Sequence, residues 1–133
     1  MKDVSELILP DGCGFHEEHT WARVDGEDVL VGISDYAQDQ LGEVVFVELP
    51  ETERVFAAGE SFGTVESIKA VNELHMPVTG QVAAINGDLE DTPSLVNANC
   101  YERGWMLRVR PENPADVDAL MQADAYREFL RRL

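Results

Sequence analysis

Short β-prone runs, most of them closed by a turn former, constrain the fold of this 133-residue chain more than any other feature. The strongest run is Val-Val-Phe-Val-Glu-Leu at residues 44–49, which ends at Pro50. Gly and Pro separate several other runs, a pattern typical of short strands joined by turns. The strands that we predict cover residues 19–24, 29–33, 44–49, 54–57, 61–66, 70–75, 78–85 and 105–109. The chain is therefore predicted to be mainly β.

A short helix is predicted at residues 35–41, between two of these runs. Ser34 or Asp35 can cap its first turn, and Gly42 is a common residue at a helix end. Residues 86–99 are rich in turn formers and leave room for one further helical turn.

The C-terminal part of the chain changes character. Asn113 can cap a helix, Pro114 suits its first position, and apolar residues then recur at helical spacing. We predict one or two helices within residues 113–132, which cover the β body, and a loose lead-in over residues 1–14. No linker divides the chain, so residues 1–133 are expected to form a single domain.

The balance of charge argues against nucleic acid as a partner. The chain has 26 acidic and 10 basic residues, a formal net charge of -16. Binding to nucleic acid needs a cationic surface, which this composition does not provide. The acidic surface either keeps the protein soluble by mutual repulsion or steers it to basic patches on larger partners.

Apolar runs and cysteines indicate the compartment. No apolar run is long enough to cross a membrane, and the acidic first ten residues do not resemble a signal peptide, so we expect a cytoplasmic protein. Cys13 and Cys100 are too few for a disulfide framework and are expected to be free thiols. Cys13, His16 and His19 have a spacing that zinc could use, but a fourth ligand is not evident, so no metal site is predicted.

One lysine attracts attention because lysine is rare in this chain. Only Lys2 and Lys69 occur, against eight arginines. Lys69 lies between the runs Ser61–Glu66 and Ala70–His75, which would pair as a hairpin with Ser67–Lys69 at its tip. A tip holds the lysine in solvent on rigid strands, where a modifying enzyme can reach it. The plainer interpretation is an ordinary solvated surface lysine, which is the commonest state of this residue.

Five segments of the sequence, in order, resemble glycine cleavage system H-proteins. They are VGISDYAQDQLGEVVFVELPE (31–51), VESIKAV (65–71), PVTGQVAAIN (77–86), LEDTPSLVN (89–97) and GWMLRVRP (104–111). The likeness runs from about His19 to Leu133. One such motif would be weak evidence, whereas five in order are specific. The resemblance implies a lipoyl/biotinyl-carrier-like fold, a flattened β-barrel or hybrid barrel-sandwich with short helices and a C-terminal helical cover.

The resemblance also implies a cofactor and the residue that carries it. The acceptor motif of the family, E-S-x-K-A, matches Glu66, Ser67, Lys69 and Ala70, with Ile68 at the variable position. Lipoate would be attached to Lys69 by an amide bond that removes the charge of the lysine. Lysine plus lipoyl chain should reach roughly 14 Å from the backbone. The protein would be a shuttle without catalysis of its own, because the redox chemistry belongs to the cofactor.

The partners implied by the family are the enzymes of the glycine cleavage cycle. Glycine decarboxylase loads an aminomethyl group, aminomethyltransferase passes the carbon to tetrahydrofolate, and dihydrolipoyl dehydrogenase reoxidises the dithiol. A lipoate ligase or a lipoyl/octanoyl transferase would attach the arm. We expect a monomer, because a shuttle must leave each partner.

The residues that would hold the loaded arm are less clear from the sequence. The family motif H-E-W reads His-Thr-Trp at residues 19–21, and Thr20 cannot pair with an ammonium group as a carboxylate does. Glu73 stands four residues after Lys69, where the family often has an acid, and Glu18 adjoins the motif. We expect Glu73 or Glu18 to contribute to arm docking, with Thr20 as a further candidate. The alternative is that both acids are solvated surface groups.

Two further segments depart from the family pattern. His75 and Met76 replace an aromatic and a small residue, which we interpret as a tolerated surface change. The segment Cys100–Arg103 also differs from the usual sequence. A free cysteine there could oxidise, but nothing in the sequence assigns it a role.

Other interpretations of Lys69 stay open. Biotinyl carriers flank their lysine with methionines, whereas Ile68 and Ala70 stand here. Lipoyl domains of 2-oxo-acid dehydrogenases usually show D-K-A and are tethered by flexible linkers. An H-like depot, which passes octanoyl or lipoyl groups to other carriers, would use Lys69 in the same way. A self-contained enzyme is disfavoured, because no Ser-His-Asp order, phosphate loop or convincing carboxylate pair is present.

Overall fold

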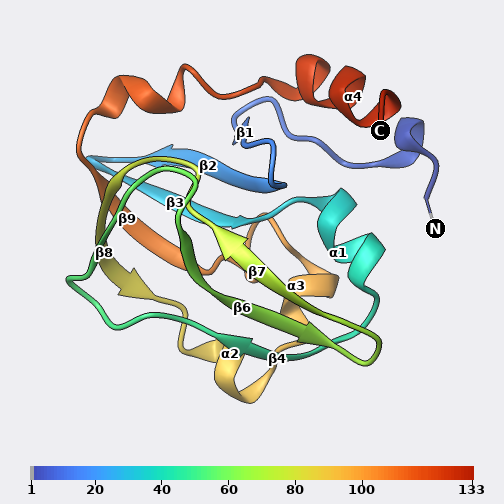
Figure 1. Ribbon diagram of the computed structural model, residues 1–133, viewed down its shortest axis with the longest axis horizontal. Helices are drawn as coiled ribbons and strands as arrows, with labels where there is room; N and C mark the ends of the chain where they lie inside the picture. The colour runs from blue at the N-terminus through green and yellow to red at the C-terminus, as the bar shows by residue number, and fades with distance from the viewer. Residues whose placement is uncertain (1) are drawn as a thin grey trace.

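The computed structural model, which describes residues 2–133, contains two antiparallel sheets (Figure 1). The strands are β1 (Gly14–Phe15), β2 (Thr20–Asp25), β3 (Asp28–Ile33), β4 (Val44–Glu48), β5 (Val55–Phe56), β6 (Ser61–Ser67), β7 (Val71–His75), β8 (Gly80–Ile85) and β9 (Leu107–Pro111). The larger sheet has the order β1-β2-β3-β9-β8-β5, and the smaller one has the order β4-β6-β7. Within the described residues no strand pairing joins the sheets into a closed barrel. The mainly β prediction is confirmed, in its sandwich form.

Short helices connect and cover the sheets. They are η1 (Val4–Glu6), α1 (Asp35–Leu41), α2 (Asp88–Asp91), α3 (Leu95–Ala98), η2 (Pro114–Val117) and α4 (Ala123–Arg131). The C-terminal segment that holds η2 and α4 runs along β1 and β2 (Figure 1), so the predicted helical cover is confirmed. None of the helices in residues 2–133 is long and apolar enough to cross a membrane.

The helix α1 forms where its end signals predicted it. The cap is Ser34, whose hydroxyl oxygen accepts a hydrogen bond from the backbone N–H of Ala37 at 3.2 Å. The helix ends at Gly42, which has a φ of 76°, a conformation that favours glycine. Asp35 instead turns its carboxylate towards the N-terminal segment.

Two apolar clusters hold the molecule together. The first takes residues from both sheets, such as Val31, Val65 and Val82, and therefore fills the space between them. The second is largely aromatic and lies between the N-terminal segment, β1, β2 and α4. Trp21 and Tyr126 are fully buried in the second cluster.

The prediction of a loose lead-in is wrong for residues 2–14. Leu7 is buried in the aromatic cluster. The backbone N–H of Ile8 donates to the carboxylate of Asp35 at 2.8 Å, and the hydroxyl of Tyr101 donates to the carbonyl of Ile8 at 2.6 Å. The second contact joins residues 93 positions apart. Local sequence patterns carry no signal for such a partner.

Strand boundaries differ from the prediction where side chains compete with the sheet. The last strand, β9, begins at Leu107, two residues after the predicted start. The side-chain amide of Asn86 donates to the carbonyl of Trp105 at 2.7 Å, so this carbonyl is used outside the strand ladder. The hairpin of β6 and β7 forms as predicted, with antiparallel pairs from Ser61 opposite His75 onward to its tip.

Candidate functional site

The tip of the β6–β7 hairpin is organised around one hydroxyl group. Ser67 is buried, and its Oγ accepts hydrogen bonds from the backbone N–H groups of Lys69 at 3.2 Å and Ala70 at 3.1 Å. The backbone N–H of Ser67 donates to the carbonyl of Ala70 at 2.8 Å, and that of Ile68 donates to the carbonyl of Glu43 at 3.3 Å. The tip backbone is thus fixed, while the side chain of Lys69 is exposed.

The lysine side chain lies against the end of α1. A Cβ added at Gly42 would stand 3.4 Å from Cε and 3.8 Å from Nζ of Lys69. The carbonyl of Gly42 accepts a hydrogen bond from the side-chain amide of Asn97 at 2.8 Å, which holds this backbone in place. Lys69 therefore stands beside the point where α1 ends.

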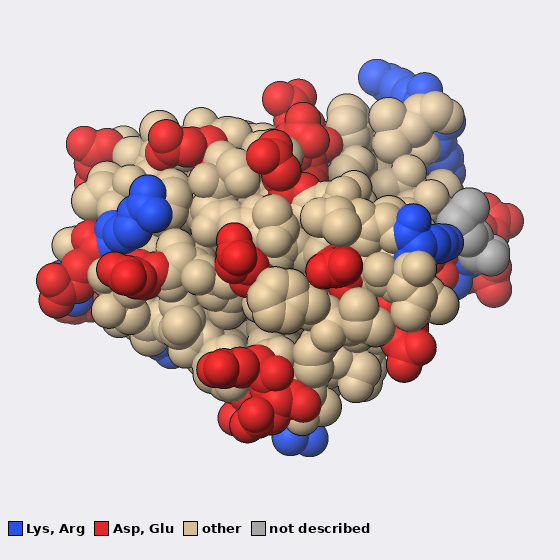
Figure 2. All heavy atoms as spheres, turned by 60° about the horizontal axis from the view of Figure 1, so that its bottom comes forward, with Lys and Arg blue, Asp and Glu red and all other residues tan. Residues whose placement is uncertain are grey.

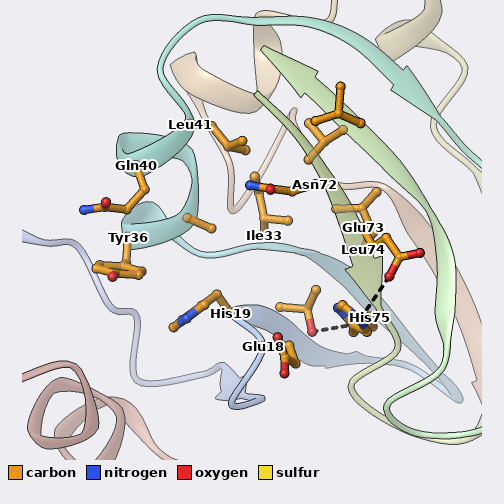
Figure 3. Close-up of a pocket in the computed structure, with 14 residues that line it drawn as sticks. Glu18, His19, Ile33, Tyr36, Gln40, Leu41, Asn72, Glu73, Leu74 and His75 are labelled. Atoms are coloured by element: carbon orange, nitrogen blue, oxygen red, sulfur yellow. Dashed lines mark hydrogen bonds and ion pairs between the residues drawn. The ribbon is translucent and has the colours of Figure 1, made fainter. Parts of the chain in front are cut away.

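A cleft of about 450 Å³ lies between α1 and β7, and its lining includes Leu41, next to Gly42, and Val71, two residues after Lys69. Figure 3 shows Tyr36 and Gln40 on the α1 side and Asn72 and Glu73 on the β7 side. Leu41 adjoins Gly42 at the end near Lys69, whereas Glu18, His19 and His75 gather at the other end. Five residues of β7, from Val71 to His75, cover about 13 Å at the rise of an antiparallel strand.

The cleft carries two carboxylates. Glu18 and Glu73 line it, and both side chains are exposed. An oxygen of Glu73 lies 3.9 Å from Nε2 of His75 (Figure 3). Thr20 also lines the cleft but is 1% exposed, and its hydroxyl donates to the carbonyl of His75 at 2.8 Å. Thr20 thus joins β2 to the end of β7, and the acidic character of the cleft comes from the two glutamates.

A chain of hydrogen bonds behind the cleft includes His19. Ser34 Oγ lies 2.8 Å from the hydroxyl of Tyr126, which lies 2.8 Å from Nδ1 of His19. The hydroxyl oxygen of Ser34 also accepts the N–H of Ala37 at 3.2 Å, so the cap of α1, Tyr126 and His19 belong to one hydrogen-bonded chain. Burial lowers the pKa of His19 below its ordinary value, so the neutral ring adds no positive charge to the cleft.

The comparison with known proteins decides the family. A family profile described as Glycine cleavage H-protein matches residues 13–133. The chain belongs to the glycine cleavage H-protein family. A glycine cleavage system H protein of Magnetococcus marinus is 49% identical over 124 residues, covering 93% of this chain and 89% of that protein. The H protein of Staphylococcus carnosus is 46% identical over 124 residues, covering 93% of this chain and 98% of that protein.

The fold agrees with the same assignment. The crystal structure of a glycine cleavage system H protein from Mycobacterium marinum has a TM-score of 0.83 and 33% sequence identity to this chain. The match covers 94% of this chain and 100% of that one. The resemblance drawn from the five sequence segments is therefore confirmed, and the chain is a member of a family of carrier components.

Within this H-protein chain, Glu66 and Ala70 stand beside the tip, whereas Cys13 and His16 lie elsewhere. Glu66 is exposed on β6, and Ala70 is exposed at the tip. Cys13 is buried in the aromatic cluster, where burial raises the pKa of its thiol to about 11. His16 is half-buried, and burial lowers its pKa. Residues 2–133 contain no group of three His, Cys, Asp or Glu side chains placed to hold a metal ion.

The interpretation of His75 and Met76 as a surface change is wrong. Met76 is fully buried in the cluster between the sheets, and His75 lines the cleft. The backbone N–H of Met76 donates to the carbonyl of Glu60, and the carbonyl of Met76 accepts from Gly59. These bonds turn the chain inward directly after β7.

Sequence reasoning missed the wall of the cleft that α1 provides. Tyr36, Ala37, Gln40 and Leu41 follow the spacing of one helix face, so the pattern could have grouped them. What this face opposes is β7, which lies about thirty residues further along the chain. The helical period therefore identifies this face of α1 but not the strand that lies opposite it.

Proposed function

We propose that this protein is the lipoyl-bearing shuttle of the glycine cleavage system, with the lipoyl group joined to Lys69 by an amide bond. The observation that carries the proposal is the position of Lys69, exposed on a fixed hairpin tip at one end of an acidic cleft. The lipoyl group, when bound, supplies a dithiolane that accepts an aminomethyl group and the electrons released from glycine. The chain itself then binds, orients and releases, without a catalytic step of its own.

The cleft fits an arm of this kind in length and in lining. The stretch from Val71 to His75 covers about 13 Å, close to the reach of roughly 14 Å that bond lengths give to a lipoyl-lysine. Val71 is exposed beside the tip, whereas Glu18, His19 and His75 lie towards the other end of the cleft. An apolar chain with a polar end matches that order.

The charged end of the cleft suits a cationic cargo. Glu18 and Glu73 would attract an ammonium group at the end of the arm, and the neutral ring of His19 would not repel it. Thr20 would contribute by holding the wall of the cleft through its bond to His75. The acid that H-proteins carry in the H-E-W motif is thereby replaced by Glu18, two residues earlier in the chain.

The proposal also covers the oligomeric state of the protein, its compartment and its partners. Residues 1–133 act as one carrier domain, a monomer in the cytoplasm that leaves each partner after use. The partners are glycine decarboxylase, aminomethyltransferase and dihydrolipoyl dehydrogenase, together with a lipoate ligase or lipoyl/octanoyl transferase. Both cysteines are buried, and burial raises the pKa of Cys100 to about 12, which suits thiols that stay unreactive.

Intact mass and peptide mapping of the protein from its native host test the proposal. We expect the mass of one lipoyl group on the peptide that contains Lys69. Biotin on that peptide would overturn the lipoyl assignment, and an unmodified Lys69 in cells that lipoylate other proteins would overturn the carrier role. A second assay, exchange of the glycine carboxyl group with bicarbonate in the presence of glycine decarboxylase, separates a glycine cleavage shuttle from a lipoyl depot.

A further inference from the structure

The outer face of the small sheet has an unusual strand beside the lysine. In β4, Val44 pairs with Ser67 and Phe46 pairs with Glu66, which leaves Val45 as an extra residue. Such a β-bulge turns two successive side chains to one face of the sheet. Val44 is buried, whereas Val45 is 46% and Phe46 49% exposed. The bulge therefore presents an aliphatic and an aromatic side chain to solvent.

Two further apolar side chains are exposed at the tip and on the neighbouring strand β7. Ile68 is 73% and Val71 61% exposed, and Phe46, Glu66 and Val71 form one row across the three strands. We call the four apolar residues Val45, Phe46, Ile68 and Val71 the tip face. Exposed aromatic and aliphatic groups that lie together are typical of interaction surfaces.

The tip face lies in acidic surroundings. The segments 43–49 and 61–75, which form the small sheet, contain four glutamates and Lys69 as their one lysine or arginine. The glutamates, all exposed, are Glu43, Glu48, Glu66 and Glu73. Figure 2, which turns the bottom of Figure 1 forward, shows a face on which acidic side chains outnumber basic ones and are separated by uncharged surface. A complementary partner therefore has an apolar pocket with basic side chains around it.

The length of the side chain at residue 69 indicates which partner binds the tip face. An unmodified lysine side chain extends only about 6 Å from the backbone, whereas a lipoyl-lysine extends roughly 14 Å. An enzyme that acts on Nζ must therefore contact the surface next to the tip, but an enzyme that acts on the dithiolane can bind further away. We propose that the tip face is the docking surface for the enzyme that attaches the arm, and that this enzyme binds it with an apolar pocket ringed by Arg or Lys. The inference rests on the proposed role of Lys69 as the acylated residue.

The chemical step at this surface is an acyl transfer. The deprotonated Nζ of Lys69 attacks the carbonyl carbon of an acyl adenylate, which the enzyme forms from lipoate and ATP with release of pyrophosphate. The new bond is the amide, the acyl–phosphate bond breaks, AMP leaves with its electron pair, and the amine gives up a proton. Docking of the tip face has to bring Nζ into the active site before this step.

Steady-state acylation of the unmodified protein by a lipoate ligase, with lipoate and ATP, tests the inference. The variants are Phe46→Ser and Val45→Ser, with Val24→Ser as the control, since Val24 is an exposed valine of β2 in the other sheet. We expect KM for the carrier to rise about ten-fold for Phe46→Ser and less for Val45→Ser, with kcat within about two-fold. Phe46→Leu should restore most of the affinity, and salt should raise KM for the unaltered chain.

The possible outcomes separate this inference from the proposed function. A KM for both serine variants equal to that of the Val24→Ser control would overturn the docking surface while leaving Lys69 as the carrier residue. No acylation of the unaltered chain at all would instead contradict the proposed function. Thermal melting of each variant identifies loss of fold, and the milder Val45→Ser change still reports on docking if Phe46→Ser melts early.

Discussion

Buried side chains hold the aromatic cluster beneath α4, whereas backbone hydrogen bonds hold the tip of the β6–β7 hairpin. In the cluster, Trp21 and Tyr126 are fully buried, and the indole N–H of Trp21 donates to the carbonyls of Ile33 and Cys100. At the tip, most side chains are exposed, and the backbone is held by hydrogen bonds to Ser67. The residue proposed to carry the arm thus stands where few contacts depend on it. The cleft adjoins both regions, because β7 of the hairpin forms one of its walls and His19, which contacts Tyr126, lines its far end.

Replacing the lysine at the tip should produce the largest functional effect with almost no structural cost. Lys69→Arg keeps the charge but removes the amine that forms the amide, so lipoylation should be lost completely. The melting temperature should stay unchanged, because the side chain is exposed. Intact mass after incubation with a lipoate ligase measures the first effect. Lys2→Arg, at the only other lysine, is the matched control and should still gain one lipoyl group.

Replacing a residue of the aromatic cluster should have the opposite result. Trp21→Ala removes a fully buried indole and two hydrogen bonds, so the free energy of unfolding should fall by about 3–5 kcal/mol. Urea denaturation measures this change, with Val24→Ala on the exposed end of the same strand as the control. A Trp21→Ala protein of unchanged stability would contradict the view that this cluster anchors the chain.

The part of the site that the sequence could predict is the local part. The position of Lys69 at a hairpin tip followed from two β-prone runs, and the cap and end of α1 followed from Ser34 and Gly42. Both depend on residues that are neighbours in the chain.

The rest depends on contacts that no local pattern encodes. His19 meets Tyr126 across 107 positions, and Ile8 meets Tyr101 across 93. Tyr126 lies in the predicted helical cover, but the contact of its hydroxyl with the cleft wall is a property of the assembled fold. The cleft could therefore not be predicted, although most of its residues could be placed on elements.

A smaller effect on stability is expected from replacing Ser67, whose hydroxyl holds the backbone of the tip. Ser67→Ala removes the acceptor of two backbone N–H groups, which should cost about 1–2 kcal/mol of stability. The loosened tip should also slow acylation of Lys69, which the ligase assay measures. Ser61→Ala on the same strand is the control, because its hydroxyl makes one 3.3 Å bond to the carbonyl of Gly63. Equal acylation rates for both variants would show that the tip does not need this hydroxyl.

The smallest expected effect is the change of stability with pH that His19 and His16 cause. Burial lowers the pKa of His19 and of His16, so in both cases the folded protein binds a proton less readily than the unfolded chain. Their contribution to stability is therefore fully present above the ordinary histidine pKa of about 6.5 and is lost as pH falls through the lower folded values. Denaturation midpoints measured between about pH 8 and pH 5 should decrease.

A variant at His19 isolates its share of this pH dependence. His19→Asn is suitable because the residue has a φ of 73°, which asparagine tolerates better than most side chains. The variant cannot titrate there, so its stability should fall less steeply with pH, while the part due to His16 remains. Parallel stability curves for His19→Asn and the unaltered chain would show that the titration of His19 does not contribute to the pH dependence of stability.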